Sequence, residues 1–156
     1  LIENIIVMAL LITLLSAGYV NFWNFNKERL LYSKALEVKS TLDEAYLKAT
    51  QGQSFEEDLP YNFGVCFKDN EFTIFPTLSN WDERNQMYVQ INELPNPLHF
   101  AVHNLPLPCD DFASGCVVFS AITGETARDG SIVIFDEDTN EEYKINVRKA
   151  GLIEIE

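Results

Sequence analysis

The sequence predicts an α+β protein in which one long N-terminal helix, first hydrophobic and then amphipathic, packs on a C-terminal antiparallel β-sheet domain. Residues 4–26 contain no charged side chain, and residues 26–50 contain neither proline nor glycine and are rich in good helix formers. Short β-like runs separated by turn residues occupy the rest of the chain. We therefore expect a helix within residues 1–53 and a β-rich head domain over residues 54–156.

The composition suits one packed domain with an acidic surface. The 156 residues are 47% hydrophobic and 22% charged, which excludes general disorder. Lys and Arg number 11 against 24 Asp and Glu, which gives a formal net charge of −13 at pH 7. Most of this negative charge falls on the head domain, because the helix is nearly charge-balanced. Such a surface repels phosphate backbones and anionic lipid headgroups, so we expect no nucleic-acid partner.

Residues 1–26 form the apolar part of the predicted helix, which is long enough to span a membrane. A cleaved secretory signal has basic residues before its apolar core, whereas this chain has Glu3 there. The carboxylate has two interpretations that the residues leave open. Glu3 either lies at a helix N-terminus in the headgroup zone, where the helix dipole favours it, or pairs with a cation on another copy of the chain.

Residues 27–53 form the amphipathic part of the predicted helix. Apolar residues recur there at alternating spacings of four and three, which places them on one stripe: Leu31, Ala35, Val38, Leu42, Ala45 and Ala49. We expect this stripe to pack on the sheet of the same chain rather than in a separate coiled coil. One helix over residues 1–50 is about 75 Å long, so its first half must protrude into a membrane or between neighbouring copies. Gly18 is the expected weak point of this rod.

The head domain contains several runs with the composition of β-strands. They are residues 62–67, 71–75, 86–94, 98–102, 116–121, 131–135, 143–148 and 152–155. Residues 68–70 predict a hairpin turn between the first two runs, and residues 136–142 predict a turn between the strands that flank them. Strands that follow one long helix indicate an α+β module.

The first residues of the chain resemble those of a known family. Leu1-Ile2-Glu3 followed by an uninterrupted apolar helix is similar to the start of mature type IV pilins and type II secretion pseudopilins, whose mature chains usually begin Phe-Thr-Leu-Ile-Glu. Glu3 matches the glutamate of that motif. The two family residues before Leu1 have no counterpart here, which leaves the N-methylated terminal residue of the family unassigned.

The head domain resembles the pseudopilin H and FimT-like pilin group of that family. The residues that carry this resemblance are Phe63-Gly64-Val65, Trp81, Leu94-Pro95, the segment 130–135 and Gly151-Leu152-Ile153. Some FimT-like members bind DNA through basic residues near the C-terminus. The basic residues at that place here, Lys144, Arg148 and Lys149, stand beside several glutamates, so DNA binding is not carried over.

The resemblance implies a structural subunit of a type IV pilus-like extracellular filament with a pilin-like fold. The assembly residues would be Leu1, Ile2, Glu3, Ile5, Ile6 and Gly18. The partners would be further copies in a helical homopolymer, a prepilin peptidase and the inner-membrane assembly machinery. Before assembly the subunit would be a single-pass membrane protein. Adhesion, motility and DNA uptake stay open as the purpose of the filament.

Two alternatives to this function stay open. One is a minor pseudopilin of a type II secretion pseudopilus. The other is a single-span, membrane-anchored extracellular binding domain, which predicts basic residues such as Lys27, Arg29 and Lys34 just after the apolar segment. Glu28 dilutes that basic flank, and this second alternative leaves the acid near the N-terminus unexplained.

Three cysteines allow three disulfide pairings, each of which leaves one thiol over. In an exported domain we expect Cys109 to pair with Cys116, because the two are close in sequence and the intervening loop, with Gly115, closes easily. Cys66 lies in a predicted strand, where we expect it to be a small buried hydrophobic side chain.

The sequence lacks the motifs of enzymes and cofactor sites. It has no nucleophile elbow, phosphate-binding loop or Gly-rich dinucleotide motif, and His99 and His103 have no third metal ligand nearby. Asp136, Asp138 and Asn140 resemble the opening of a calcium loop, but the glycine and the distal glutamate of such a loop are missing. A solvated turn is the preferred interpretation. We expect no catalytic residue, no metal and no cofactor.

Overall fold

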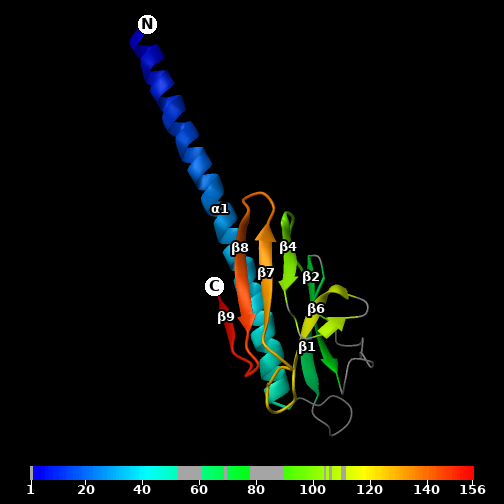
Figure 1. Ribbon diagram of the computed structural model, residues 1–156. Coiled ribbons are helices and arrows are strands. Elements are labelled where there is room, and N and C mark those ends of the chain that lie inside the picture. Colours follow the sequence, from blue (N-terminus) through cyan, green and yellow to red (C-terminus); the bar gives the residue numbers. More distant parts are fainter. Residues whose placement is uncertain are drawn as a thin grey trace.

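The computed structural model describes residues 2–52, 61–68, 70–77, 90–103, 105, 107–109 and 112–156. One long helix, α1 (Ile2–Thr50), projects by its first half from a head domain made of strands (Figure 1). The strands are β1 (Asn62–Lys68), β2 (Glu71–Thr77), β3 (Gln90–Glu93), β4 (Leu98–His103), β5 (Leu107–Cys109), β6 (Phe112–Phe119), β7 (Gly130–Asp136), β8 (Glu141–Val147) and β9 (Ile153–Ile155). The fold is α+β, as the sequence predicts.

Helix α1 is continuous over 49 residues, which corresponds to a length of about 74 Å at 1.5 Å per residue. Its backbone stays helical through Gly18, the predicted weak point. One glycine costs a helix roughly 1 kcal/mol, which does not interrupt a helix with strong helix formers before and after it.

Two antiparallel sheets pack beside the second half of α1. The first sheet has the strand order β3-β2-β1-β6-β5, and the second has the order β4-β7-β8-β9. Hairpins join β1 to β2, with Val65 opposite Ile74, and β7 to β8, with Ile132 opposite Ile145. The helix contacts β1, β2 and β6 of the first sheet and β7, β8 and β9 of the second. It therefore unites the two sheets around one core.

The predicted apolar stripe of α1 is confirmed as the helix side of this core. Every member of the stripe has an exposed fraction of 0%: Leu31, Ala35, Val38, Leu42, Ala45 and Ala49. The same cluster contains side chains from both sheets, among them Val65, Phe67, Phe72, Phe119, Ile132, Ile134, Ile145 and Val147. Because burial of apolar surface contributes about 25 cal/mol per Å², this packing fixes the second half of the helix to the head domain.

The C-terminal end of α1 contacts the turn before β7 and the turn between β8 and β9. The carbonyl oxygen of Ala49 accepts hydrogen bonds from the backbone N–H of Gly52 at 3.1 Å and from that of Ile122 at 2.9 Å, and the second bond ties the last helical turn to the head domain. Gly124 and Gly151 have φ angles of 69° and 81° and lie against the ring of Tyr46. A Cβ atom at either glycine would collide with that ring, so both positions require glycine.

Most of the predicted strands are confirmed, with ends that differ by one or two residues. The predicted strand 116–121 is an exception, since β6 begins earlier, at Phe112, where it pairs with β5. Strand β5 itself was not expected, because prolines surround it in the sequence. Within the predicted run 86–94, β3 covers Gln90–Glu93, and residues 86–89 and Trp81 lie outside the described residues.

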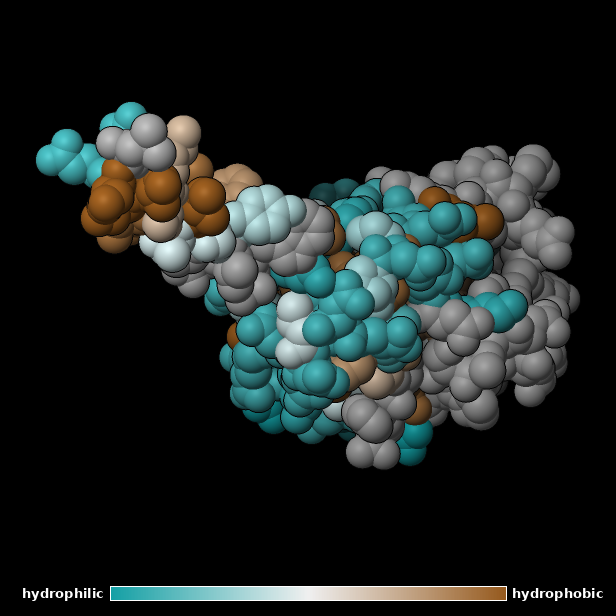
Figure 2. Space-filling view, turned by 90° about the horizontal axis from the view of Figure 1, so that it is seen from above, coloured by the Kyte–Doolittle hydropathy of each residue, from teal (hydrophilic) through white to brown (hydrophobic). Residues whose placement is uncertain are grey.

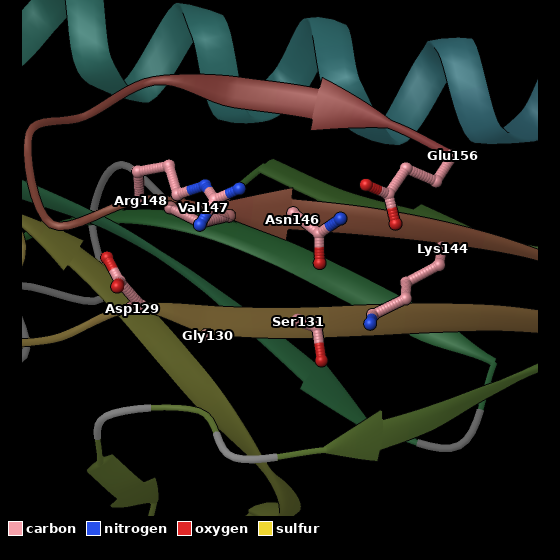
Figure 3. A pocket seen from close by; sticks show the side chains of 8 residues that line it. All are labelled: Asp129, Gly130, Ser131, Lys144, Asn146, Val147, Arg148 and Glu156. Atoms are coloured by element: carbon pink, nitrogen blue, oxygen red, sulfur yellow. The ribbon is translucent and has the colours of Figure 1, made fainter.

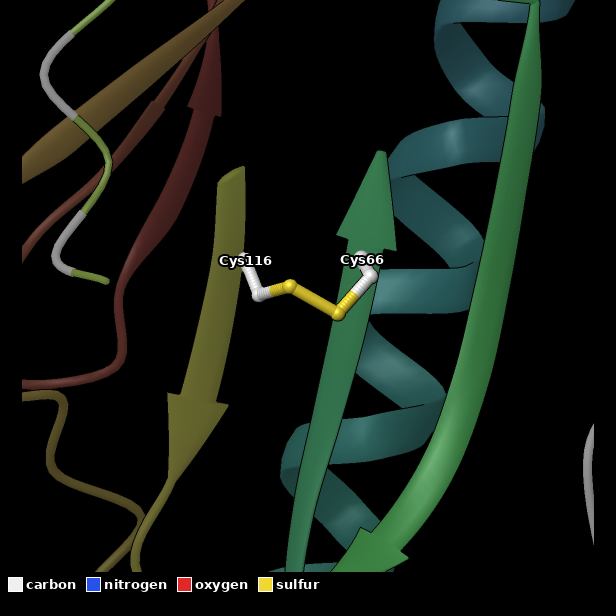
Figure 4. Close-up of a disulfide and its surroundings, with 2 residues drawn as sticks. All are labelled: Cys66 and Cys116. Atoms are coloured by element: carbon white, nitrogen blue, oxygen red, sulfur yellow. A yellow bond between two sulfur atoms is a disulfide. The ribbon is translucent and has the colours of Figure 1, made fainter. Parts of the chain in front are cut away.

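The predicted disulfide between Cys109 and Cys116 is wrong, because Cys116 is bonded to Cys66 (Figure 4). These two residues lie directly opposite each other on β1 and β6, with Cα atoms 4.1 Å apart. The register of β5 places Cys109 opposite Phe112. The residue opposite Cys116 on β5 is Leu107, so the β5–β6 pairing does not place Cys109 against Cys116.

Candidate functional surfaces

The first half of α1 presents apolar side chains on all sides. It extends beyond the head domain in Figure 1 and forms the hydrophobic end of the space-filling view in Figure 2. The following side chains are each at least 50% exposed: Ile2, Ile5, Ile6, Val7, Met8, Leu10, Leu11, Ile12, Leu14 and Leu15. A helix that is apolar around its whole circumference needs an apolar environment on every side, which a single flat contact does not supply.

The hydroxyl groups of this segment are satisfied within the helix itself. Thr13 Oγ1 donates to the carbonyl oxygen of Leu10 at 2.8 Å, and Ser16 Oγ donates to that of Ile12 at 2.8 Å. These two side chains therefore need neither water nor another polar partner.

Glu3 is the acidic residue of the first helical turn, and its side chain is exposed. The positive end of the helix dipole favours a carboxylate at this place. No basic residue lies between Glu3 and Lys27 in the sequence. Lys27 is about 36 Å further along the helix axis, so its side chain does not reach this carboxylate.

The predicted assembly residues lie on one exposed segment. Ile2, Ile5 and Ile6 are exposed near the free end of α1, and Gly18 lies further along the unbroken helix. Leu1 is outside the described residues. The structure of one chain does not bring these residues together with any part of the head domain (Figure 1).

The head domain contacts α1 through the β7–β8 hairpin at the point where the helix reaches it. Lys27 Nζ lies 2.7 Å from Asp138 Oδ2 in the turn between β7 and β8. Slightly further along, the rings of Tyr32 and Tyr143 are 5.5 Å apart. Leu31, between these two contacts, is the first member of the fully buried stripe. The exposed apolar part of the helix thus leaves the head domain from a fixed base.

A second candidate site is a shallow polar hollow on the second sheet (Figure 3). Its volume is about 340 Å³, and its lining residues are Asp129, Gly130, Ser131, Lys144, Asn146, Val147, Arg148 and Glu156. Ile145 and Val147 are buried in the core, so Lys144, Asn146 and Arg148, which alternate with them, point to the opposite, solvent-facing side of the sheet. We call this surface the polar hollow.

The polar hollow combines basic and acidic side chains from three neighbouring segments. Glu156 and Lys144 are joined by two backbone hydrogen bonds of 3.0 and 2.8 Å, and Asp129 Oδ1 accepts a hydrogen bond from the backbone N–H of Lys149. Arg148 Nη2 lies 3.8 Å from Glu154 Oε2, a loose ion pair between two half-exposed side chains. This arrangement presents both signs of charge to solvent.

The sequence reasoning missed the polar hollow because it weighed the basic residues only against their sequence neighbours. The pairing of β7 with β8 places Ser131 opposite Asn146. The signal that could have found the site is the alternation of Lys144, Asn146 and Arg148 with apolar residues, which predicts one polar face of a strand.

The residues that resemble a calcium loop form the turn between β7 and β8. Asp136 Oδ1 accepts a hydrogen bond from the N–H of Asp138 at 2.9 Å, and the carboxylate of Asp138 pairs with Lys27. Asn140 has a φ of 56°, which such a turn requires. Among the described residues, no group of three or more His, Cys, Asp or Glu side chains could hold a metal ion. The acids serve the turn and its contact with α1.

Of the two histidines of β4, the structure describes the side-chain contacts of His99. His99 Nδ1 lies 3.7 Å from Glu137 Oε1, and its ring centroid is 5.2 Å from that of Phe135. The side chain of His103 lies outside the described residues. The contacts of His99 are those of a side chain at the rim of the second sheet.

Comparison with protein-family models, with curated proteins and with solved structures finds no match to this chain. In the part of the chain that the structure describes, no helix combines the length and the apolar content that crossing a membrane requires. Among the described residues, a function can be argued from the exposed apolar half of α1 and from the polar hollow.

Proposed function

We propose that the chain is a structural, non-catalytic subunit of a type IV pilus-like extracellular filament and assembles through the first half of α1. The observation that supports this most is the apolar segment Ile2–Leu15, whose large side chains are each at least 50% exposed. Leaving such surface in water costs about 25 cal/mol per Å². A bundle of parallel helices from other copies covers every side of the segment at once.

The resemblance of the chain to type IV pilins and pseudopilins supports the same proposal. Leu1-Ile2-Glu3 and the apolar helix match the start of mature chains in that family, and a head domain of antiparallel strands packed on the second half of the helix agrees with a pilin-like fold. The net charge of −13 suits a head domain that faces water on the outside of a filament.

The proposal also includes the route to the filament. Before assembly, the apolar segment needs a nonpolar environment, and we assign it to the inner membrane, with the head domain outside the cytoplasm. A prepilin peptidase and an inner-membrane assembly machinery are the partners that such a subunit requires. Neither a cofactor nor a nucleic acid has a part in this function.

Electron microscopy of material sheared from the cell surface tests the proposal. Filaments built mainly of this chain are expected for the wild type. Leu11→Glu places a charge on the apolar segment and should abolish filaments, because a carboxylate inside a helix bundle is strongly disfavoured. Ser33→Glu is the matched control: it adds the same charge at an exposed position of the second half of α1 and should leave filaments intact.

Two other outcomes would reject this function in favour of its alternatives. Labelling of the chain only at filament tips would indicate a minor pseudopilin. Recovery of the wild-type chain with membranes and without filaments would indicate a membrane-anchored binding domain.

A further inference from the structure

The two turns that flank β8 carry opposite charges. Residues 136–142, at the start of β8, contain five acids and no base, and we call them the acidic turn. Residues 148–152, after β8, contain Arg148 and Lys149 and no acid, and we call them the basic turn. Arg148 and Lys149 are the only two consecutive Lys or Arg residues of the chain. Strand β8 therefore separates a concentration of negative charge from a concentration of positive charge.

The two turns lie at opposite ends of the part of α1 that is bound to the head domain (Figure 1). The acidic turn is at the helix entry, where Asp138 pairs with Lys27 at 2.7 Å. The basic turn is at the helix end, where Gly151 lies against the ring of Tyr46. Lys27 and Tyr46 are about 29 Å apart along the helix at 1.5 Å per residue. The charges of the two turns are thus separated along the axis of α1.

Both turns present exposed charged side chains. In the acidic turn, Glu137 is 70% exposed, and its Oε1 lies 3.7 Å from His99 Nδ1. In the basic turn, Arg148 is 54% exposed and lies 3.8 Å from Glu154, and Lys149 is exposed. Exposed ion pairs at such distances contribute little to stability. The side chains of Glu137, Arg148 and Lys149 can therefore pair with opposite charges on another molecule.

The charge pattern favours another copy of the chain as the partner, in a head-to-tail arrangement. The net charge is −13, so most surfaces of one copy repel those of another. The basic turn is an exception, and the acidic turn is the surface that complements it. A two-fold contact through either turn would bring that turn against itself, and like charges in contact are destabilising. A head-to-tail contact brings the basic turn of one copy to the acidic turn of the next.

We propose that the basic turn of one copy docks on the acidic turn of the next copy, in a contact that repeats along the filament. The proposal rests on the proposed filament function, because that function keeps the α1 helices of all copies parallel. Lys149 of one copy then faces Glu137 of the next. Each copy offers one turn of each kind, so the contact continues from copy to copy as an open array. The apolar helices hold the filament together, and the two turns determine which head domains meet.

The dimensions of α1 are compatible with this contact. Residues 2–25 and residues 27–50 are each about 36 Å long. A copy that is shifted by about 36 Å along α1, and sideways by about 10 Å, the spacing of packed helices, has its helix entry level with the helix end of the first copy. Its apolar half then lies beside the α1 of the first copy, so the two helices do not overlap. Since both turns lie on the β8 side of α1, the sideways step leaves them about one helix diameter apart, which a lysine and a glutamate side chain together can span.

Electron microscopy of filaments sheared from cells that express the full chain tests this contact. Lys149→Glu alone and Glu137→Lys alone should each lower the number of filaments roughly tenfold, because each places like charges together at every repeat. The double variant, with both changes in one chain, should regain the wild-type number. Its exchanged charges face each other again in every contact, and its net charge equals that of the wild type.

Lys144→Glu combined with Glu137→Lys is the matched control. It has the same net charge as the first double variant, but Lys144 is an exposed residue within β8 and lies outside both turns. It should form as few filaments as Glu137→Lys alone.

Three results would overturn the contact while leaving the filament function in place, provided that the wild type forms filaments. They are wild-type numbers of filaments from either single variant, a first double variant that stays as poor as the single variants, and full recovery in the Lys144→Glu control. A wild type without filaments would reject the filament function and this contact with it.

Discussion

Cys66 and Cys116 join two neighbouring strands across 50 residues of sequence. A cross-link of that span restricts the unfolded chain, and the loop-entropy relation assigns it about 4 kcal/mol. The double variant Cys66→Ala with Cys116→Ala should therefore unfold at a clearly lower denaturant concentration than the wild type, as followed by circular dichroism. Cys109→Ser should keep the cross-link and most of the stability. Mass spectrometry that finds Cys109 linked to either of the other cysteines in the wild type would contradict this.

The cysteine pairing shows why residue-scale contacts are harder to predict than residue types. The loop between Cys109 and Cys116 is short, which made that pairing attractive, but those residues form a hairpin whose strands separate the two cysteines. The Cys66–Cys116 bond follows from the β1–β6 register, which no local pattern in the sequence specifies. Burial of Cys66 was predicted correctly, because residues 63–67 of its strand are apolar, but its bond to Cys116 was not predicted.

The second half of α1 is held by one stripe of side chains, which gives a prediction at the scale of the element. Leu42 is fully buried in that stripe, whereas Leu47 on the outer side of the helix is 51% exposed. Leu42→Ala should lower the free energy of unfolding by about 2–5 kcal/mol, since it removes buried methyl groups and leaves a cavity. Leu47→Ala, the matched control, should change it by about 0.5 kcal/mol or less. Chemical denaturation measures both, and equal losses would contradict the assigned packing.

The helix was predictable from the sequence and the sheets only in part. The stripe that begins at Leu31 repeats with the period of a helix, and such a pattern depends on near neighbours alone. The positions of most strands follow from local composition, but their division into two sheets does not, because β4 pairs with β7 across some thirty residues. The polar hollow depends on that same pairing of distant segments, since Asp129 and Glu156 flank β8 only after the second sheet has formed.

The whole molecule has an apolar end and an acidic end, and its charge leads to a prediction for assembled filaments. Filaments that display a head domain with most of a net charge of −13 repel one another. Their lateral association should rise with added salt, which screens this repulsion, and with falling pH toward the pI of about 4.4. Light scattering and electron microscopy of purified filaments measure the association, with sucrose as an uncharged control for added solute. Bundling that is indifferent to both salt and pH would show that electrostatics do not govern it.

The last prediction concerns Glu3 in the assembled molecule. Inside a bundle of apolar helices this carboxylate would be surrounded by Ile5, Ile6 and their copies, where an unpaired charge is strongly disfavoured. No basic side chain lies between Glu3 and Lys27, and in a pilin-like subunit the cation best placed to neutralise the carboxylate is the N-terminal amine of a mature chain. An amine from a neighbouring copy would also fix the axial stagger, because only one stagger brings the two groups together.

Glu3→Ala should therefore leave the head domain folded and the chain in the membrane, while filaments are lost or become rare in electron micrographs. Glu28→Ala is the matched control, since it removes an exposed acid of the same helix beyond the apolar segment and should leave filaments abundant. Circular dichroism of both variants establishes that the fold is intact. Abundant normal filaments from Glu3→Ala, or a filament structure with Glu3 far from every N-terminus, would refute pairing between subunits, because assembly would then proceed without the charge that sets its register.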